Sequence, residues 1–202
     1  MADAYPNVHA LILAAGGSRR LGRPKQLLRW QGRTLLERAV DCARRVVPGR
    51  VIVVLGAEAA LIRATLNEDR IETVQNGAWH EGIASSISVG IEALPASAEA
   101  VLILLCDQPL VDSAHLAAML DAWRNEPNRI VASQYNSTCG VPALFPAMYF
   151  ERLKALTGDK GAQPLLVEFD RNVAKIPFTR AALDIDTRSD FERLTGQVFT
   201  EE

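Results

Sequence analysis

The stretch that decides the fold runs from Leu11 to Lys25 and reads Leu-Ile-Leu-Ala-Ala-Gly-Gly-Ser-Arg-Arg-Leu-Gly-Arg-Pro-Lys. A short apolar run, typical of a β-strand, ends in small residues, and basic residues follow. Small residues let a backbone approach a ligand closely and turn its N–H groups outward. Arg19, Arg20, Arg23 and Lys25 add positive charge at the same place. We therefore expect this turn to hold the charged tail of a nucleoside triphosphate, which needs both N–H donors and cations.

The spacing of the glycines separates this turn from two better-known phosphate-binding loops. A dinucleotide-binding fold needs G-x-G-x-x-G between strand and helix, whereas the glycines here stand at 16, 17 and 22. Gly17 and Gly22 have the spacing of a Walker loop, but Arg23-Pro24 follows where Lys-Ser or Lys-Thr is required. Pro24 also lacks an N–H donor. We therefore predict neither kind of loop. The alternative to a nucleotide site is an ordinary strand-to-helix turn with a basic rim.

Length and composition are typical of one globular domain. The chain has 202 residues, of which 49% are apolar and 23% charged. We expect a single domain over residues 1–202, with its core at about 8–190. The net charge of −2 comes without a basic block, which argues against nucleic-acid binding. The first apolar run is short and no run approaches membrane-spanning length, so we expect neither a signal peptide nor a membrane segment.

The cysteines indicate a reducing compartment. Cys42, Cys106 and Cys139 are far apart and odd in number, which argues against a disulfide scaffold. No C-x-x-C motif is present and the three histidines form no ligand pattern, which argues against a structural zinc site. We therefore expect a cytoplasmic protein.

Apolar runs alternate with segments of helical periodicity along the chain. The expected strands are 8–13, 50–55, 71–74, 100–106, 130–133, 142–145 and 173–176. The expected helices are 35–46, 57–66, 85–94, 114–123 and 147–156, and a last helix opens at the capping-box pair Thr187 and Asp190. Such alternation predicts an α/β fold with a mainly parallel twisted sheet and helices on both faces. Ligands of such sheets bind beyond the carboxyl ends of the strands, where the Leu11–Lys25 turn lies.

Two acidic positions follow predicted strands. Asp107 stands at the carboxyl end of the most apolar strand and would lie close to the Leu11–Lys25 turn if the two strands are neighbours. Magnesium is held by one or two carboxylates together with substrate phosphates, so Asp107 is the first expected metal ligand. Asp186 is the second, although spacing alone does not separate it from Asp184. For both positions the alternative is a turn or helix-cap residue.

The segment from Asn76 to Ser86 carries a second candidate contact surface. Gly82, Ser85 and Ser86 could place backbone and hydroxyl donors against a base or ribose. Ser85 could instead be a plain helix N-cap, and Trp79 is expected in the core rather than as a stacking platform. The polar turn at 158–163 either meets the second substrate or simply connects two helices.

The opening turn and several later segments resemble the MobA-like nucleotidyltransferases. Residues 13–25 match the signature L-A-[AG]-G-x-[SA]-x-R-[ML]-G-x-x-K. The other matching segments are Asn76 to Ser86, Leu105-Cys-Asp-Gln-Pro109, Pro142-Ala-Leu-Phe145, Gly158-Asp-Lys-Gly-Ala162 and Asp184-Ile-Asp-Thr187. The resemblance spans about Val8 to Asp190. Within the superfamily the chain is most similar to the molybdenum cofactor cytidylyltransferases.

The resemblance implies a three-layer Rossmann-like fold of the nucleotide-diphospho-sugar transferase type. The activity it implies is transfer of CMP from CTP to molybdopterin, the organic part of the molybdenum cofactor, with release of pyrophosphate. The implied catalytic residues are Lys25, Arg19 and Asp107, and Mg²⁺ would be held by Asp107 and Asp186. The implied nucleotide-binding residues are Leu13, Ala14, Ala15, Gly16, Gly17, Ser18, Lys25, Gly82, Ser85 and Ser86.

Three positions bear on which nucleotide base and which acceptor the resemblance implies. Ala15 stands where guanylyl-transferring relatives usually carry Gly, which favours cytidine. Gln163 stands where Arg is expected and Val141 where His is common, and both positions concern the acceptor. The expected partners are CTP, the molybdenum cofactor and a molybdoenzyme or its maturation chaperone. The alternatives are a sugar phosphate, methylerythritol phosphate or another phosphorylated acceptor with CTP or GTP, and a non-catalytic protein that binds and delivers a cofactor.

Overall fold

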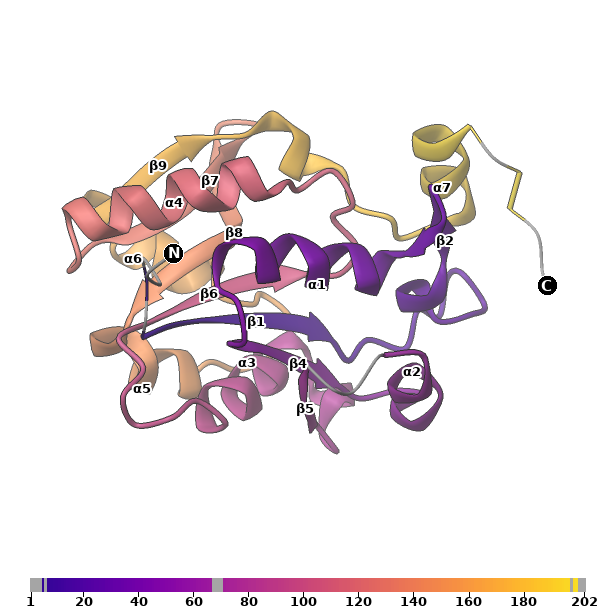
Figure 1. The fold of residues 1–202 in the computed structure, drawn as a ribbon, viewed down its shortest axis with the longest axis horizontal. Coiled ribbons are helices and arrows are strands. Elements are labelled where there is room, and N and C mark those ends of the chain that lie inside the picture. The colour runs from indigo at the N-terminus through magenta and orange to yellow at the C-terminus, as the bar shows by residue number, and fades with distance from the viewer. Residues whose placement is uncertain (1–4, 6, 67–70, 197, 200–202) are drawn as a thin grey trace.

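The protein is built around a seven-stranded sheet. Its strands are, in spatial order, β5 (Glu72–Gln75), β4 (Val51–Leu55), β1 (Val8–Ala14), β6 (Ala100–Leu105), β8 (Thr138–Pro146), β7 (Ile130–Tyr135) and β9 (Val173–Pro177) (Figure 1). The computed structural model describes residues 5, 7–66, 71–196, 198 and 199. β8 runs antiparallel to both of its neighbours, and the other pairings in this sheet are parallel. The expected α/β fold with a mainly parallel sheet is therefore confirmed.

Seven α-helices and several short 3₁₀ turns connect the strands in the described part of the chain. The α-helices are α1 (Leu35–Val46), α2 (Ala59–Thr65), α3 (Ile83–Glu92), α4 (Ser113–Asn125), α5 (Phe150–Lys154), α6 (Gln163–Glu168) and α7 (Arg188–Thr195). The 3₁₀ turns are η1 (Lys25–Leu27), η3 (Trp79–Glu81), η4 (Ala147–Tyr149), η5 (Asp170–Asn172) and η6 (Thr179–Ala182). A separate hairpin joins β2 (Arg29–Trp30) to β3 (Arg33–Thr34). None of the helices described has both the length and the apolar character that crossing a bilayer requires.

Helices cover both faces of the sheet because the central strands are apolar on both sides. Ala10 and Ile12 of β1 pack with α1 and α4 in one core, whereas Leu11 and Leu13 pack with α3 and α5 in the other. Figure 1 shows these helix pairs above and below the sheet. Alternate residues of a strand point to opposite faces, so a continuous apolar run of this kind is the pattern of a strand buried on both faces.

The register of the central strands sets the position of the site. β1 pairs in parallel with β6, and Leu13 lies opposite Leu105. The chain therefore leaves both strands at the same edge of the sheet. Asp107, two residues beyond β6, is brought beside the turn that follows β1, as expected if these strands were neighbours.

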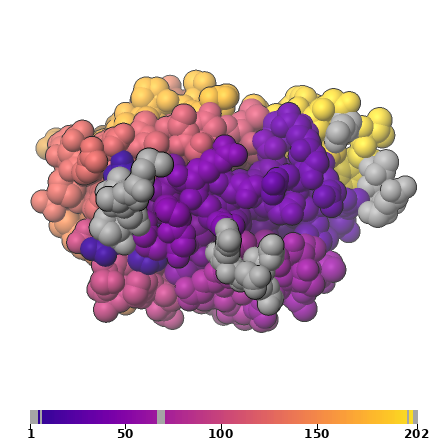
Figure 2. Space-filling view, in the orientation of Figure 1, coloured from indigo at the N-terminus to yellow at the C-terminus, as the bar shows by residue number. Residues whose placement is uncertain are grey.

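A small third core ties the opening turn to the C-terminal part of the chain. It contains Leu21, Leu28 and Leu35 from the N-terminal side and Ile185 and Phe191 from the C-terminal side. These segments lie side by side in Figure 1, and the yellow and purple surfaces also meet in Figure 2. The Ile185 N–H donates to the Asp107 carbonyl at 3.0 Å. This core therefore positions the acids at 184 and 186 relative to the opening turn.

The predicted elements are present, with differences at their ends, whereas α6 and the β2–β3 hairpin were not predicted. The capping box at Thr187 and Asp190 is formed, and Asp112 caps α4 by accepting a hydrogen bond from the His115 N–H at 2.9 Å. α3 begins two residues earlier than predicted, with Gly82 as its N-cap, so Ser85 is not the cap. The helix predicted at 147–156 is the turn η4 followed by α5. α6 was not predicted, because six residues starting Gln163-Pro164 are too few to show helical periodicity.

Candidate active site

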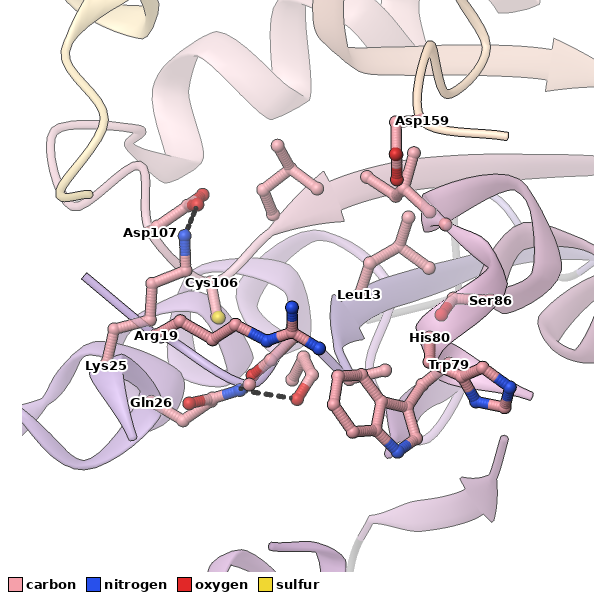
Figure 3. A pocket seen from close by; sticks show the side chains of 17 residues that line it. Leu13, Arg19, Lys25, Gln26, Trp79, His80, Ser86, Cys106, Asp107 and Asp159 are labelled. Carbon is pink, nitrogen blue, oxygen red and sulfur yellow. Dashed lines mark hydrogen bonds and ion pairs between the residues drawn. The ribbon is translucent and has the colours of Figure 1, made fainter. Parts of the chain in front are cut away.

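A cavity of about 370 Å³ lies at the carboxyl ends of β1 and β6 (Figure 3). It is lined by Leu13, Ala14, Ala15, Gly16, Gly17, Arg19, Lys25, Gln26, Trp79, His80, Gly82, Ile83, Ser86, Leu105, Cys106, Asp107 and Asp159. Figure 3 shows Lys25 and Asp107 on one side and Trp79, His80 and Ser86 on the other. The cavity thus has a charged end and an end with aromatic, small and hydroxyl groups.

The turn after β1 is held in shape by Gln26. This side chain is fully buried, and its amide donates to the carbonyls of Ala14 at 2.7 Å and Gly16 at 2.9 Å. The Lys25 N–H donates to the Ser18 hydroxyl at 2.9 Å, and Ser18 itself has a left-handed backbone, with φ of 48°. Asx and Ser/Thr side chains commonly stabilise such turns. The turn is therefore fixed in place, and two carbonyl oxygens that would repel a phosphate are already paired.

Lys25 lies between two carboxylates that are far apart in the sequence. Its ammonium contacts Asp107 and donates to Asp186 at 2.9 Å, and Arg20 contacts the other oxygen of Asp186 at 2.7 Å. Burial alone would lower the pKa of Lys25, but the Asp107 carboxylate and the hydrogen bonds outweigh it and hold the pKa above its ordinary value. Burial would likewise raise the pKa of Asp186, but Lys25 and Arg20 hold it below its ordinary value. Two cations and two anions are thus in contact, and a third carboxyl, Asp184, lies near them, where burial and the charge of Asp107 raise its pKa to about 6.

Asp107 and Asp186 fit a divalent cation as an incomplete ligand set. Asp107 is 8% exposed, and its Oδ1 is buried without a hydrogen-bond partner in the described structure. Burial, followed by the charge of Asp107, raises the pKa of the neighbouring Cys106 to about 12, so this thiol stays neutral. In the described part of the chain no group of three or more His, Cys, Asp or Glu side chains could hold a metal ion. Magnesium commonly binds one or two carboxylates plus substrate phosphates, and these two carboxylates meet that pattern.

The opposite end of the cavity contains a hydrogen-bond network centred on Asn76. The Asn76 Oδ1 accepts from the Ala78 N–H at 2.9 Å, which sets the orientation of the amide. Its Nδ2 therefore donates to the hydroxyls of Ser85 at 2.9 Å and Ser86 at 3.0 Å. The Ser85 hydroxyl in turn donates to the carbonyls of Ala78 and Gly82. Ser86 lines the cavity, and its own proton remains available as a donor to a ligand.

Trp79 packs against the opening turn and forms part of the cavity wall. A Cβ atom at Gly17 would lie 3.2 Å from the indole ring, and one at Gly56 would lie 2.6 Å from the Trp79 Cβ. Small residues at both positions therefore allow the close approach. We predicted that Trp79 belongs to the core rather than to a stacking surface. The structure places it at the edge of one core and in the cavity wall as well.

Gly82 is constrained by its backbone and by a neighbouring segment. Its φ is +109°, and a Cβ would lie 2.5 Å from the backbone of Gly158. We expect Gly82→Ala to lower the free energy of unfolding by about 1–3 kcal/mol, because strained backbone and a clash with main-chain atoms both oppose it. Urea denaturation measures this loss. Gly77→Ala is the control, because a Cβ there meets nothing within 4 Å; equal stability of the two variants would contradict the assignment.

Most of the residues predicted for the site line this one cavity. Among those expected to bind nucleotide or to act in catalysis, Ser18 and Ser85 do not line it, although each supports a residue that does. Asp186 lies beside the cavity and meets Lys25, whereas no ion pair joins Lys25 to Asp184 in the described structure. Sequence reasoning missed Gln26 and the part played by Asn76. A buried amide beside a charged turn leaves no periodic signal in a sequence.

A second cavity, of about 290 Å³, adjoins the first and shares Leu13, Ile83, Leu105 and Asp159 with it. Its wall includes Tyr135 and Cys139, together with Val141 and Gln163, the two departures from the family pattern. The polar turn at 158–163 also contributes to this wall. The turn therefore faces both cavities, and its contact with a second substrate stays a prediction.

A family model for the MobA-like NTP transferase domain matches residues 10–173. The chain belongs to the MobA-like NTP transferase family. The matched residues of this MobA-like protein include the opening turn, Asn76, Ser86 and Asp107 and end before Asp186. The nucleotidyltransferase fold and the family resemblance expected from the sequence are both confirmed.

The individual relatives differ in how much of this MobA-like chain they match. The crystal structure of Rv0371c from Mycobacterium tuberculosis is 31% identical, with a TM-score of 0.83 over 95% of this chain and 98% of that one. A structure of Rv0371C in complex with manganese is 28% identical, with a TM-score of 0.77 over 96% and 100%. Nicotine blue oxidoreductase of Paenarthrobacter nicotinovorans is 37% identical over 136 residues, 65% of this chain and 64% of that protein. The chain thus matches less than two thirds of the length of that relative.

Proposed function

We propose that the protein transfers CMP from CTP to the terminal phosphate of molybdopterin and releases pyrophosphate. The observation that carries the proposal is the cluster of Lys25, Asp107 and Asp186 at one end of a cavity whose other end offers the Ser86 hydroxyl. A nucleoside triphosphate is similarly asymmetric, because its charged phosphates lie at one end and its hydrogen-bonding base lies at the other. The molybdopterin acceptor and the preference for CTP rest on the sequence resemblance.

The chemistry proposed for these residues is alignment and charge neutralisation. A terminal phosphate has a second pKa of about 6, so the acceptor is largely a dianion near neutral pH and needs no general base. Lys25, Arg19 and the backbone of residues 14–17 would bind the α-phosphoryl oxygens and the departing pyrophosphate. A magnesium ion held by Asp107 and Asp186 would supply further positive charge to the phosphate oxygens. The manganese-bound relative supports a divalent cation in this family.

Pyrophosphate release tests the proposal. The protein is incubated with Mg²⁺, either CTP or GTP, and in turn molybdenum cofactor, a sugar phosphate or methylerythritol phosphate. We expect release with CTP and molybdenum cofactor and little with the other pairs. Release that depends on another acceptor would overturn the acceptor, and faster release with GTP would overturn the base. No release with any pair would favour a protein that binds and delivers a cofactor.

A second candidate function is an oxidoreductase, because the 37% identical relative carries that name. An oxidoreductase transfers electrons between two substrates and would release no pyrophosphate. The opening turn lacks the glycine spacing of a dinucleotide fingerprint. A reduced nicotinamide dinucleotide is added as a probe electron donor, and its oxidation, followed by absorbance in the same preparation as pyrophosphate release, separates the two candidates.

The Asn76 network gives a prediction about recognition of the base. In Ser86→Ala the hydroxyl that lines the cavity is lost, while Asn76 can still donate to the Ser85 hydroxyl. We expect CTP affinity to fall about 3- to 10-fold, the typical effect of one hydrogen bond. Tryptophan fluorescence measures it, because Trp79 lies in the cavity wall.

Ser85→Ala is the matched control for this prediction. Ser85 accepts from the same amide but does not line the cavity, so its loss should change CTP affinity less than about twofold. Unchanged affinity in Ser86→Ala, or an equal fall in both variants, would contradict the role of Ser86 as a donor to the base.

A further inference from the structure

Lys25 stands in the place that a divalent cation would need. Its ammonium contacts both carboxylates assigned to the metal, and within the described residues no group of three or more acidic, histidine or cysteine side chains could hold a metal ion. The Lys25 side chain is 16% exposed and that of Asp107 is 12% exposed. The pair between Lys25 and Asp107 is thus largely shielded from solvent, where attraction between charges is least weakened, whereas the Asp186 side chain is 40% exposed.

We propose that Lys25 is a built-in occupant of the divalent-cation site. Its ammonium competes with the metal for Asp107 and Asp186, so the free protein binds a divalent cation weakly. A triphosphate draws the ammonium away and thereby opens both carboxylates to the metal. The last step rests on the proposed function, which identifies the triphosphate as the anion; the competition itself does not.

The charges in the cluster support this competition. Lys25 and Arg20 offset the charge of the two carboxylates that they contact, so a divalent cation arriving alone would meet carboxylates that already have cationic partners. A triphosphate brings several negative charges, and lysine and metal can then be accommodated together. Without a triphosphate, a metal that displaced the Lys25 ammonium would leave that ammonium without its carboxylate partners, which is costly for a largely buried charge.

The structure also allows Lys25 to change partners. Its backbone is fixed, because its N–H donates to the Ser18 hydroxyl and the next residue, Gln26, is buried in the turn. Its side chain lines the cavity at the charged end. A lysine side chain is a flexible four-carbon stem that carries a compact charge, so the ammonium can swing from the carboxylates to a phosphate without movement of the turn.

Manganese binding to the free protein tests the competition. Mn²⁺ is titrated into wild type, Lys25→Met and Lys25→Gln without nucleotide, and unbound Mn²⁺ is followed by electron paramagnetic resonance. We expect both variants to bind Mn²⁺ at least about 10-fold more tightly than wild type, because a positive charge adjacent to both carboxylates is removed. Arg29→Met is the control for net charge, since Arg29 is exposed and its guanidinium donates to the Gly32 carbonyl; its affinity should equal that of wild type.

Thermal unfolding gives a second readout that does not depend on activity. Without metal, Lys25→Met leaves Asp107 and Asp186 with less compensation, so we expect a lower midpoint than wild type. A ligand that binds the folded state stabilises it in proportion to its affinity, so Mn²⁺ should raise the midpoint of the variant by more than that of wild type. Equal or weaker Mn²⁺ binding by both Lys25 variants, with folded circular dichroism spectra, would overturn the proposal.

Equilibrium dialysis with saturating CTP tests the second step. The Mn²⁺ affinity of wild type should then approach that of Lys25→Met, because the Lys25 ammonium of wild type would bind the triphosphate of CTP and no longer the carboxylates. A gap that stays 10-fold would overturn the transfer of Lys25 to the triphosphate. Failure of the protein to bind CTP would instead remove the proposed function and leave the competition measured without nucleotide intact.

Discussion

An Asp107→Asn protein is expected to release pyrophosphate at least about 100-fold more slowly than wild type. Asparagine keeps the shape of the side chain but removes the negative charge that faces Lys25. It also weakens one of two expected metal ligands. Loss of a preorganised charge contact typically costs about 2.7–4 kcal/mol in the transition state, which corresponds to this rate. Steady-state pyrophosphate release with saturating CTP and acceptor measures the effect.

The same change at a distant acid provides the control. The control variant is Asp121→Asn. Asp121 lies on α4, where its carboxylate contacts the Tyr5 hydroxyl at 2.7 Å and Arg124 at 3.6 Å. We expect turnover within twofold of wild type. Turnover near the wild-type value in a folded Asp107→Asn protein would remove Asp107 from the mechanism.

Lys25→Ala is expected to lower turnover by a similar factor of about 100 or more. Alanine removes the ammonium that would bind the phosphates and leaves Asp107 and Asp186 uncompensated beside them. Because the remaining carboxylates repel a triphosphate, we also expect a higher KM for CTP at low metal concentration. Initial rates measured over a range of CTP and Mg²⁺ concentrations separate these effects, and Arg29→Ala is the matched loss of one positive charge.

The two variants differ in how they respond to metal. Asp107→Asn removes a ligand and should weaken Mn²⁺ binding, whereas loss of the Lys25 ammonium should strengthen it. Slower turnover together with tighter Mn²⁺ binding in a variant that lacks the Lys25 ammonium is expected only if Lys25 both binds the phosphates and competes with the metal for the carboxylates. Near-normal turnover in Lys25→Ala would refute the first of these roles whatever its effect on metal.

Local patterns predicted the secondary structure well where the periodicity was long. The helix expected at 35–46 is α1 without any shift, and the apolar run at 100–106 is β6. The antiparallel direction of β8 could not be predicted, because a buried strand has the same apolar pattern in either direction. α3 begins before Ser85 because Gly82, with φ of +109°, opens the helix in a conformation that no sequence period reports.

The candidate site was predictable in its residue types and not in its contacts. The opening turn with its cations and the two acids at 107 and 186 could be named from the sequence, and the resemblance indicated their roles. The meeting of Lys25 with Asp186, 161 residues apart, depends on the third core. Ser86 could be named as a candidate donor, but its orientation depends on Asn76, whose amide is set by the Ala78 N–H.

The sequence by itself determined an α/β chain with a small, basic turn after its first strand, because strand periodicity, glycine placement and charge are local properties. Tertiary structure decided which strands are neighbours, which acid reaches Lys25 and which way each amide and hydroxyl points. Those outcomes depend on pairing and packing between segments far apart in the chain. The energies of such contacts cannot be inferred from any one segment of the sequence.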